Sequence, residues 1–325
     1  MTLPRQFEGR LGAPIIAAPM FLTSGPALVT EACKAGVIGT FPALNQRTSE
    51  GFAAWLVEIR DALAAFERDH PGRAPAPFGV NLIVHKTNPR LAADLALCER
   101  HRVPLVITSL GAIGELVDRV HGYGGVVFHD VTTLRHARSA IRAGVDGLIL
   151  VAAGAGGHAG TASPFSLVAE VGREFDGTVI LAGCISDGRQ VAAAELMGAD
   201  LAYLGTRFIA TREAMAAEAN KAMIVASSLA DITYTPAISG IPANFLTQSL
   251  IQAGLDPAHL PTKTRIDMAE ELDTEQKAWK DIWSAGQGCG TIDDVPTVAE
   301  LCRRLTAEYQ AAIAGLAARQ SGRSP

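Results

Sequence analysis

The chain has 325 residues, of which 48% are hydrophobic and 19% charged, and its 32 glycines and 17 prolines are spread along the whole length. This composition is typical of a folded enzyme and excludes a disordered or fibrous protein. The length allows one large α/β barrel or two ordinary domains. A net charge of -5 provides no positive field that would favour nucleic acid or an anionic membrane surface as a partner.

The five cysteines, Cys33, Cys98, Cys184, Cys289 and Cys302, are widely separated, and none forms a C-x-x-C pair. Reduced thiols in a cytoplasm fit this pattern best, and no metal site is expected from it. The first twenty residues hold only a short apolar run, and no later segment reaches the roughly 18 apolar residues of a membrane span. We therefore expect a cytoplasmic protein with no membrane and no nucleic-acid partner.

Short β-type runs alternate with alanine-rich amphipathic stretches, which is the pattern of βα units on a parallel sheet. The predicted strands are 14–19, 37–40, 78–83, 105–109, 125–129, 147–151, 178–182 and 201–205. The predicted helices are 24–35, 49–70, 90–101, 113–121, 132–143, 164–175, 188–197 and 214–227. Eight such units in little more than two hundred residues match an α/β fold of the (β/α)8 TIM-barrel type.

A doubly wound open sheet is the alternative, but it would use fewer strands and place a G-x-G-x-x-G turn after the first one. Here the first strand ends in Ala18-Pro19-Met20, with no such turn. Beyond residue 228 the alternation stops. We expect a barrel over residues 1–227 and a helical C-terminal subdomain over residues 228–325 that covers the barrel mouth.

Catalytic residues of a barrel come from the loops that follow the carboxyl ends of its strands. The loop after the sixth predicted strand holds His158 among glycines that include Gly156 and Gly157. These glycines permit positive φ and let a flat or phosphorylated ligand approach the backbone. A histidine that bonds its own loop is the structural alternative, but the glycines favour a catalytic role.

The loops after the last two strands carry small residues that suit a phosphate site. Ala182-Gly183-Cys184 follows the seventh strand, and Gly205-Thr206 follows the eighth. Barrel enzymes commonly bind a phosphate with backbone N–H groups of these two loops. Ordinary turn glycines are the alternative, but the two loops together favour a phosphate-bearing cofactor. Without a carboxylate cluster for Mg²⁺, that cofactor is predicted to be FMN, bound non-covalently.

Two further strand ends suit the ring of a flavin. Asn81 is polar inside the apolar third strand, and a flavin edge would satisfy its buried carboxamide, as would a hydrogen bond to a neighbouring strand. Pro19 and Met20 end the first strand, where a soft side chain could lie behind the ring, although a plain core contact fits as well.

Six motifs in this order carry a resemblance to a known family: PIIAAPM, FGVNL, AGVDGLILVAAGAGGHAG, VILAGCISDGR, GADLAYLGTRFIATRE and WSAGQGCGTIDD. The sequence resembles the nitronate monooxygenases, formerly called 2-nitropropane dioxygenases, which are FMN-dependent barrel enzymes. The resemblance implies that His158 is the active-site histidine. It also implies that FMN is held at Ala18, Pro19, Met20, Asn81, Gly156, Gly157, Ala182, Gly183, Cys184, Gly205 and Thr206.

The resemblance also covers two other places. The segment 283–288 is similar to one that folds back over the flavin, so Ser284 and Gln287 are candidate substrate contacts. Some relatives carry a lysine one residue after a histidine at the end of the fifth strand, where this chain has His129-Asp130. His129 either substitutes in part for that cation near the cofactor or is a satisfied core histidine.

The implied function is oxidation of a nitronate or nitroalkane by FMN and O2 to a carbonyl compound and nitrite. An NAD(P)H-dependent FMN reductase of quinones or enoyl thioesters and a non-catalytic flavin-binding barrel are the alternatives. For a histidine with an ordinary pKa of about 6.5, His158 would work in either protonation state near neutral pH.

Overall fold

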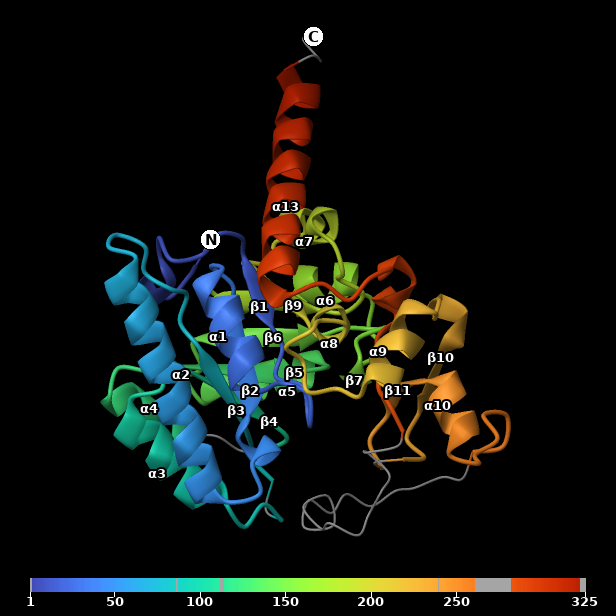
Figure 1. Cartoon of the computed structure of the whole chain (residues 1–325), viewed down its shortest axis with the longest axis horizontal. Helices are drawn as coiled ribbons and strands as arrows, with labels where there is room; N and C mark the ends of the chain where they lie inside the picture. The colour runs from blue at the N-terminus through green and yellow to red at the C-terminus, as the bar shows by residue number, and fades with distance from the viewer. Residues whose placement is uncertain (1, 86, 112–113, 239, 261–281, 322–325) are drawn as a thin grey trace.

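Eight parallel strands close into a barrel in the computed structural model, which describes residues 2–85, 87–111, 114–238, 240–260 and 282–321 (Figure 1). The strands are β1 (Ile15–Ala17), β2 (Ile38–Pro42), β3 (Gly79–Ile83), β4 (Leu105–Ser109), β5 (Val126–Val131), β6 (Gly147–Val151), β8 (Thr178–Ala182) and β9 (Leu201–Leu204). Strand β9 pairs with β1 and completes the circle. The predicted (β/α)8 fold is confirmed, and every predicted strand overlaps an observed one.

Helices cover the outside of the barrel, as repeated βα units require. They are α1 (Pro26–Lys34), α2 (Ser49–Asp69), α3 (Leu91–His101), α4 (Gly114–Gly122), α5 (Leu134–Arg142), α6 (Pro164–Val171) and α7 (Gly188–Leu196). The hydroxyl of Thr48 accepts from the N–H of Gly51 and caps α2, and Asp187 with Gln190 forms a capping box on α7. Residue 113, the predicted start of the fourth helix, lies outside the described residues.

The last helix of the chain takes the eighth place on the barrel wall. Helix α13 (Val298–Ser321) packs against α7 and α1, and its C-terminal part projects beyond the barrel (Figure 1). The stretch 214–227, predicted as the eighth helix, forms only the short α9 (Glu218–Val225), which contacts η4 (Gln287–Thr291). The eighth helix of the wall was predicted wrongly, because the helix that takes this place, α13, begins almost a hundred residues after β9 ends.

Side chains inside the barrel are apolar in its lower part and include polar residues at its carboxyl end. The lower part is apolar, with the rings of Phe7 and Phe128 packed edge to face at 6.0 Å between centroids. Because side chains alternate along a strand, residues two positions beyond interior ones also face inward. The residues two positions after Ile107, Phe128 and Leu201 are polar. They are Ser109, Asp130 and Tyr203, the top layer of the interior.

The segment after the barrel contains strands as well as helices. Strands β10 (Ile232–Thr235) and β11 (Ala243–Leu246) form an antiparallel sheet with β7 (Gly157–His158), which belongs to the loop after β6. The predicted helical C-terminal subdomain therefore contains strands as well; β11 pairs with β10 close by in sequence and with β7 more than eighty residues away. The division of the chain into residues 1–227 and 228–325 stays a prediction.

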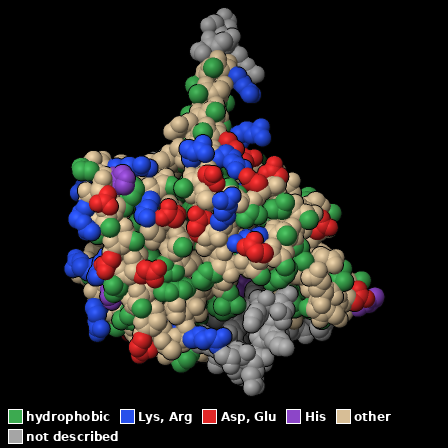
Figure 2. Space-filling view, viewed as in Figure 1, with side chains coloured by type: hydrophobic (Ala, Val, Ile, Leu, Met, Phe, Trp, Pro, Cys, Tyr) green, Lys and Arg blue, Asp and Glu red, His purple; other side chains and the backbone are tan. Residues whose placement is uncertain are grey.

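Charged side chains of both signs are interspersed over the described surface of the face in Figure 2. Within the described ranges, no helix combines the length and the apolar character that crossing a membrane requires.

The interior packing of Phe128 gives a test of the fold. Phe128→Ala removes a fully buried ring, so we expect the free energy of unfolding to fall by about 3–5 kcal/mol. Urea denaturation followed by circular dichroism measures the change. Phe165→Ala is the matched control, because Phe165 is 72% exposed and its loss should change stability by no more than about 0.5 kcal/mol. Equal effects of the two substitutions would contradict the assignment of Phe128 to the barrel interior.

Candidate active site

A cavity of about 1610 Å³ opens at the carboxyl end of the barrel. We call it the mouth cavity. Loops after most of the barrel strands line it, together with residues of the segment 282–288. The predicted site residues that line it are Ala18, Pro19, Met20, Asn81, His129, Gly156, Gly157, His158, Ala182, Gly183, Cys184, Gly205, Thr206 and Ser284.

The predicted phosphate side of the cavity is built from small residues with different tasks. Gly183 has φ +130°, which a side chain would rarely adopt. A Cβ on Gly205 would meet nothing closer than the Cβ of Ala18 at 3.8 Å, so the missing side chain leaves open space. A Cβ on Gly156, in contrast, would come within 2.9 Å of the backbone nitrogen of Gly286. Gly205 therefore leaves room for a ligand, whereas Gly156 permits close packing of two loops.

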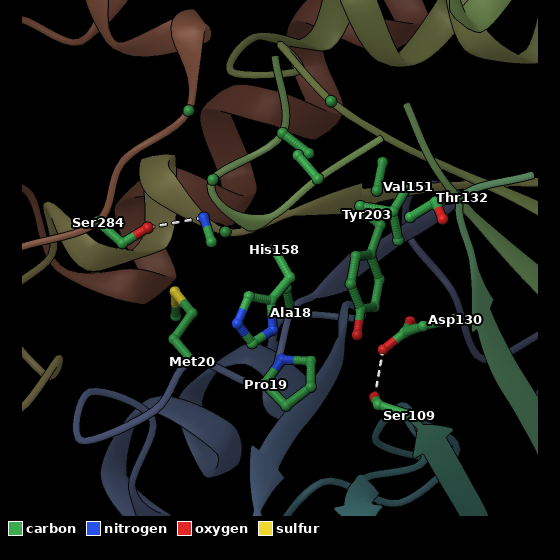
Figure 3. A pocket seen from close by; sticks show the side chains of 18 of the residues that line it. Ala18, Pro19, Met20, Ser109, Asp130, Thr132, Val151, His158, Tyr203 and Ser284 are labelled. Carbon is green, nitrogen blue, oxygen red and sulfur yellow. Dashed lines mark hydrogen bonds between the residues drawn. The ribbon is translucent and has the colours of Figure 1, made fainter. Parts of the chain in front are cut away.

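His158 is held by the chain segments that follow the barrel. Its strand β7 pairs with β11, where Ala243 lies opposite His158. The N–H of Gly157 donates to the hydroxyl of Ser284 at 2.6 Å, and that hydroxyl donates to the carbonyl of Asn244 at 2.6 Å. As Figure 3 shows, the imidazole of His158 points from this loop into the cavity, toward Pro19.

Two side chains brace the same loop on either side of the histidine. The hydroxyl of Tyr234 donates to the carbonyl of Ala159 at 2.9 Å, and the side-chain amide of Asn244 donates to the carbonyl of Ala155 at 2.7 Å. With the β7–β11 pairing, these bonds fix the loop backbone both before and after His158.

Burial lowers the pKa of His158 to about 4. The imidazole is therefore neutral at pH 7, and the expectation of an ordinary pKa near 6.5 was wrong because the loop removes the ring from water. In this state the ring offers one nitrogen that can accept a proton and one N–H that can donate a hydrogen bond. It does not present a positive charge to an anionic substrate.

His129 does not replace the missing lysine as a cation. Its Nδ1 lies 2.7 Å from the hydroxyl of Thr108, and burial lowers its pKa to about 4. Of the two possibilities left open for it, this geometry favours the satisfied core histidine.

The polar residues at the top of the barrel interior form a connected group that sequence reasoning found only in part. The side-chain amide of Asn81 donates to the hydroxyl of Ser109 at 2.9 Å and to the carbonyl of Ile107 at 3.4 Å, the neighbouring-strand bond considered as the alternative role. Ser109 in turn donates to Oδ2 of Asp130 at 2.5 Å. Ser109, Asp130 and Tyr203 were missed, although their spacing of two from apolar interior residues was available in the sequence.

The two candidate substrate residues of the last segment differ in position. Ser284 lines the cavity, but its hydroxyl is engaged by the backbone of Gly157 and Asn244. Gln287 is exposed and is not among the lining residues described; its N–H donates to the carbonyl of Gly154 at 2.9 Å. The side chain of Gln287 lies against Gly154, and its expected contact with substrate stays a prediction.

No group of three or more His, Cys, Asp and Glu side chains within the described ranges is arranged to hold a metal ion.

The sequence model of the nitronate monooxygenase family matches residues 90–308, about two thirds of the chain. The chain belongs to the nitronate monooxygenase family. Members of this family are flavin-dependent oxidoreductases, so this chain is an enzyme of that class. The match includes the loops that carry His158, Gly183 and Gly205.

Individual relatives bear different names. The chain is 26% identical to a nitronate monooxygenase of Paraburkholderia phytofirmans, with 92% of this chain and 93% of the relative covered. It is 27% identical to the (3aS,4S,5R,7aS)-5-hydroxy-7a-methyl-1-oxo-octahydro-1H-indene-4-carboxyl-CoA dehydrogenase of Rhodococcus jostii over 74% of this chain, and the match spans only 64% of that relative. A solved nitroalkane oxidase of Streptomyces ansochromogenes superposes with a TM-score of 0.75 at 26% identity, covering 96% of this chain and 100% of the other.

The open space at Gly205 gives a test of the predicted cofactor site. Gly205→Val should leave the fold intact, because a Cβ meets no atom closer than 3.8 Å, but should raise the dissociation constant for FMN at least tenfold by filling that space. Fluorescence titration of the apoprotein with FMN measures the constant. Gly122→Val is the control, since Gly122 ends α4, is exposed, does not line the cavity, and its Cβ would also meet nothing. Unchanged FMN affinity in Gly205→Val would remove this residue from the site.

Proposed function

We propose that this enzyme binds FMN in the mouth cavity and oxidises a nitronate, the conjugate base of a nitroalkane, with O2 to a carbonyl compound and nitrite. Membership of the family supports the proposal, as does similarity to a named nitronate monooxygenase along more than nine tenths of both chains. The observation that carries it is His158, a neutral imidazole held rigidly on the cavity wall. A positioned base of this kind suits removal of a proton next to a nitro group.

The residues of the cavity fit FMN in size and chemistry. Gly205 leaves open space for a phosphate, and Gly183 holds a positive φ that a side chain would rarely adopt. Ala18 to Met20 offer an apolar wall to a flat ring. Asn81, Ser109 and Asp130 supply polar groups on the floor. Bound FMN would supply the electron and oxygen chemistry, while the protein orients the substrate and limits competing reactions.

His158 performs two tasks in this proposal. Its unprotonated nitrogen accepts the α-proton of a neutral nitroalkane, and its burial keeps that nitrogen unprotonated at every pH well above 4. As a neutral ring, it also forms part of the cavity wall beside the substrate. The β7–β11 pairing and Ser284 act on the backbone, so they position the ring without touching substrate.

A second candidate function is oxidation or reduction of a bulky acyl thioester. The observation that favours it is the size of the mouth cavity, about 1610 Å³, against the roughly 300–1000 Å³ of common ligand pockets. FMN and a small nitronate would leave part of this space unused. A relative named as a CoA dehydrogenase supports the same class, and the exposed Arg47 on the cavity wall is available to an anionic group of a long substrate.

The role of His158 is tested by comparing two substrates of one variant. His158→Asn should keep the fold and the FMN spectrum but lower kcat/KM for a neutral nitroalkane by roughly two to four powers of ten, the usual contribution of a placed base. The fall for a preformed nitronate should be smaller, since its α-proton is already gone. His136→Asn is the matched control, because His136 also lines the cavity but is exposed. Wild-type activity of His158→Asn on both substrates would assign His158 to structure.

The electron donor separates the candidate functions. With no dinucleotide fingerprint and with Asp130 where some relatives carry a cation, we expect NADH and NADPH to bleach the flavin slowly or not at all under anaerobic conditions. A nitronate should reduce, and so bleach, the flavin at least as fast as the enzyme turns over. Stopped-flow absorbance records both rates. Fast bleaching by a reduced nicotinamide would favour the reductase, and bound FMN that no donor reduces would favour a non-catalytic flavin-binding protein.

A further inference from the structure

One side of the floor of the mouth cavity is polar, inside an otherwise apolar barrel, whereas Val151 and Ala182 at the same level are apolar. Interiors of such barrels are dominated by bulky branched residues, and Ile107, Phe128 and Leu201 follow that rule here. Directly above them the side chains become Ser109, Asp130 and Tyr203. As Figure 3 shows, the hydroxyl of Tyr203 points across the barrel toward the carboxyl group of Asp130. The layer faces the cavity, so its polarity serves a ligand rather than the core.

Asp130 is incompletely satisfied in this layer. Its Oδ2 accepts from Ser109 at 2.5 Å, and Ser109 accepts from Asn81 at 2.9 Å. Its Oδ1 is buried, and within the described part of the chain no group donates to it. A buried carboxylate oxygen with no donor costs free energy. The carboxyl group therefore gains from a partner that binds at the floor, or from a proton.

The charge of Asp130 has no cation to balance it among the described residues. His158, across the cavity, and His129, the preceding residue, are both neutral at pH 7 because burial lowers their pKa values to about 4. The pKa of Tyr203 is raised well above its usual value by burial and by the charge of Asp130, so its O–H keeps the proton. Ser109, the group bonded to the carboxylate, does not titrate. Burial raises the pKa of Asp130 to about 6, and the Ser109 bond opposes that rise.

We propose that Asp130 contacts bound FMN as a neutral carboxylic acid, so that cofactor binding takes up one proton at this residue. The inference rests on the proposed function, because it takes FMN as the occupant of the mouth cavity. The edge of a flavin ring carries carbonyl oxygens and ring nitrogens that accept hydrogen bonds, and a protonated carboxyl group can donate to one of them. A flat ring over the floor also removes water from Asp130, and this favours the uncharged form further.

The experiment measures FMN affinity against pH. In the wild type, the dissociation constant should rise by up to tenfold per pH unit above about pH 6, because binding then requires a proton that free Asp130 has lost. The isosteric Asp130→Asn is always neutral, so it should lack this rise and bind FMN more tightly than the wild type at pH 8. The phosphate of FMN itself titrates near pH 6, but it does so equally in both proteins, so the ratio of their constants isolates Asp130.

Ser109→Ala gives an independent reading that does not require altering Asp130. Removing the donor that stabilises the carboxylate should raise the pKa of Asp130 and move the loss of FMN affinity to higher pH. Ser166→Ala is the matched control, since Ser166 also lines the cavity but lies on α6, away from the floor. Calorimetry at pH 7 in two buffers of different ionisation enthalpy counts the protons taken up, and Asp130→Asn should take up almost one fewer than the wild type.

The outcomes are distinguishable. A smaller proton uptake in Asp130→Asn and an upward pH shift in Ser109→Ala support the assignment. Identical pH dependence in the wild type and Asp130→Asn, or in the wild type and Ser109→Ala, overturns it while leaving the flavin site intact. A wild type that takes up no FMN at any pH overturns the proposed cofactor, and this assignment with it.

Discussion

The antiparallel pairing of β7 with β11 is the interaction on which the geometry of the site depends. A barrel supplies loops at the right end of its strands, but a glycine-rich loop alone does not fix an imidazole. Here two residues of the loop after β6 become a strand because β11 offers them a partner. Ser284 completes the arrangement by bonding to the backbone of both segments. The position of His158 is thus made by hydrogen bonds between distant parts of the chain.

Burial gives the cavity an unusual set of charges at neutral pH. Two of the cavity histidines, His129 and His158, are uncharged at pH 7, and burial raises the pKa of Asp130 on the floor to about 6. Near these three residues the site therefore works with neutral donors and acceptors more than with fixed charges. Binding at this part of the cavity depends on shape and on well-placed hydrogen bonds.

The sequence allowed the barrel to be predicted well because each βα unit is a local pattern. All eight strands were found, and all but one of the predicted site residues line the mouth cavity. The tail could not be predicted in the same way. Strands β10 and β11 are short, and β11 pairs with β7, which lies far away in sequence, so no local periodicity marks them. Helix α13 likewise reaches its place on the wall by packing on α7 and α1.

Within the site, the types of residue could be predicted more easily than their burial and pKa values. His158 was found from its neighbours, but its pKa depends on how deeply the folded loop buries it, which the sequence does not state. The contact of Gln287 with substrate stays a prediction. Asp130 was noted only as a departure from relatives that carry a lysine. Its role on the floor follows from strand alternation once Phe128 is known to face inward.

The bond between Gly157 and Ser284 joins residues that are 127 positions apart. Closing so long a loop is entropically costly, and contacts of this kind form late in folding, after local units have paired. The strands and outer helices can therefore fold almost completely before the bond between Gly157 and Ser284 holds the loop that carries His158. In the folded protein, release of the tail is a smaller event than unfolding of the barrel. We therefore expect activity to be lost at lower denaturant than the strand signal of the barrel, because activity depends on the docking of the segment 282–288.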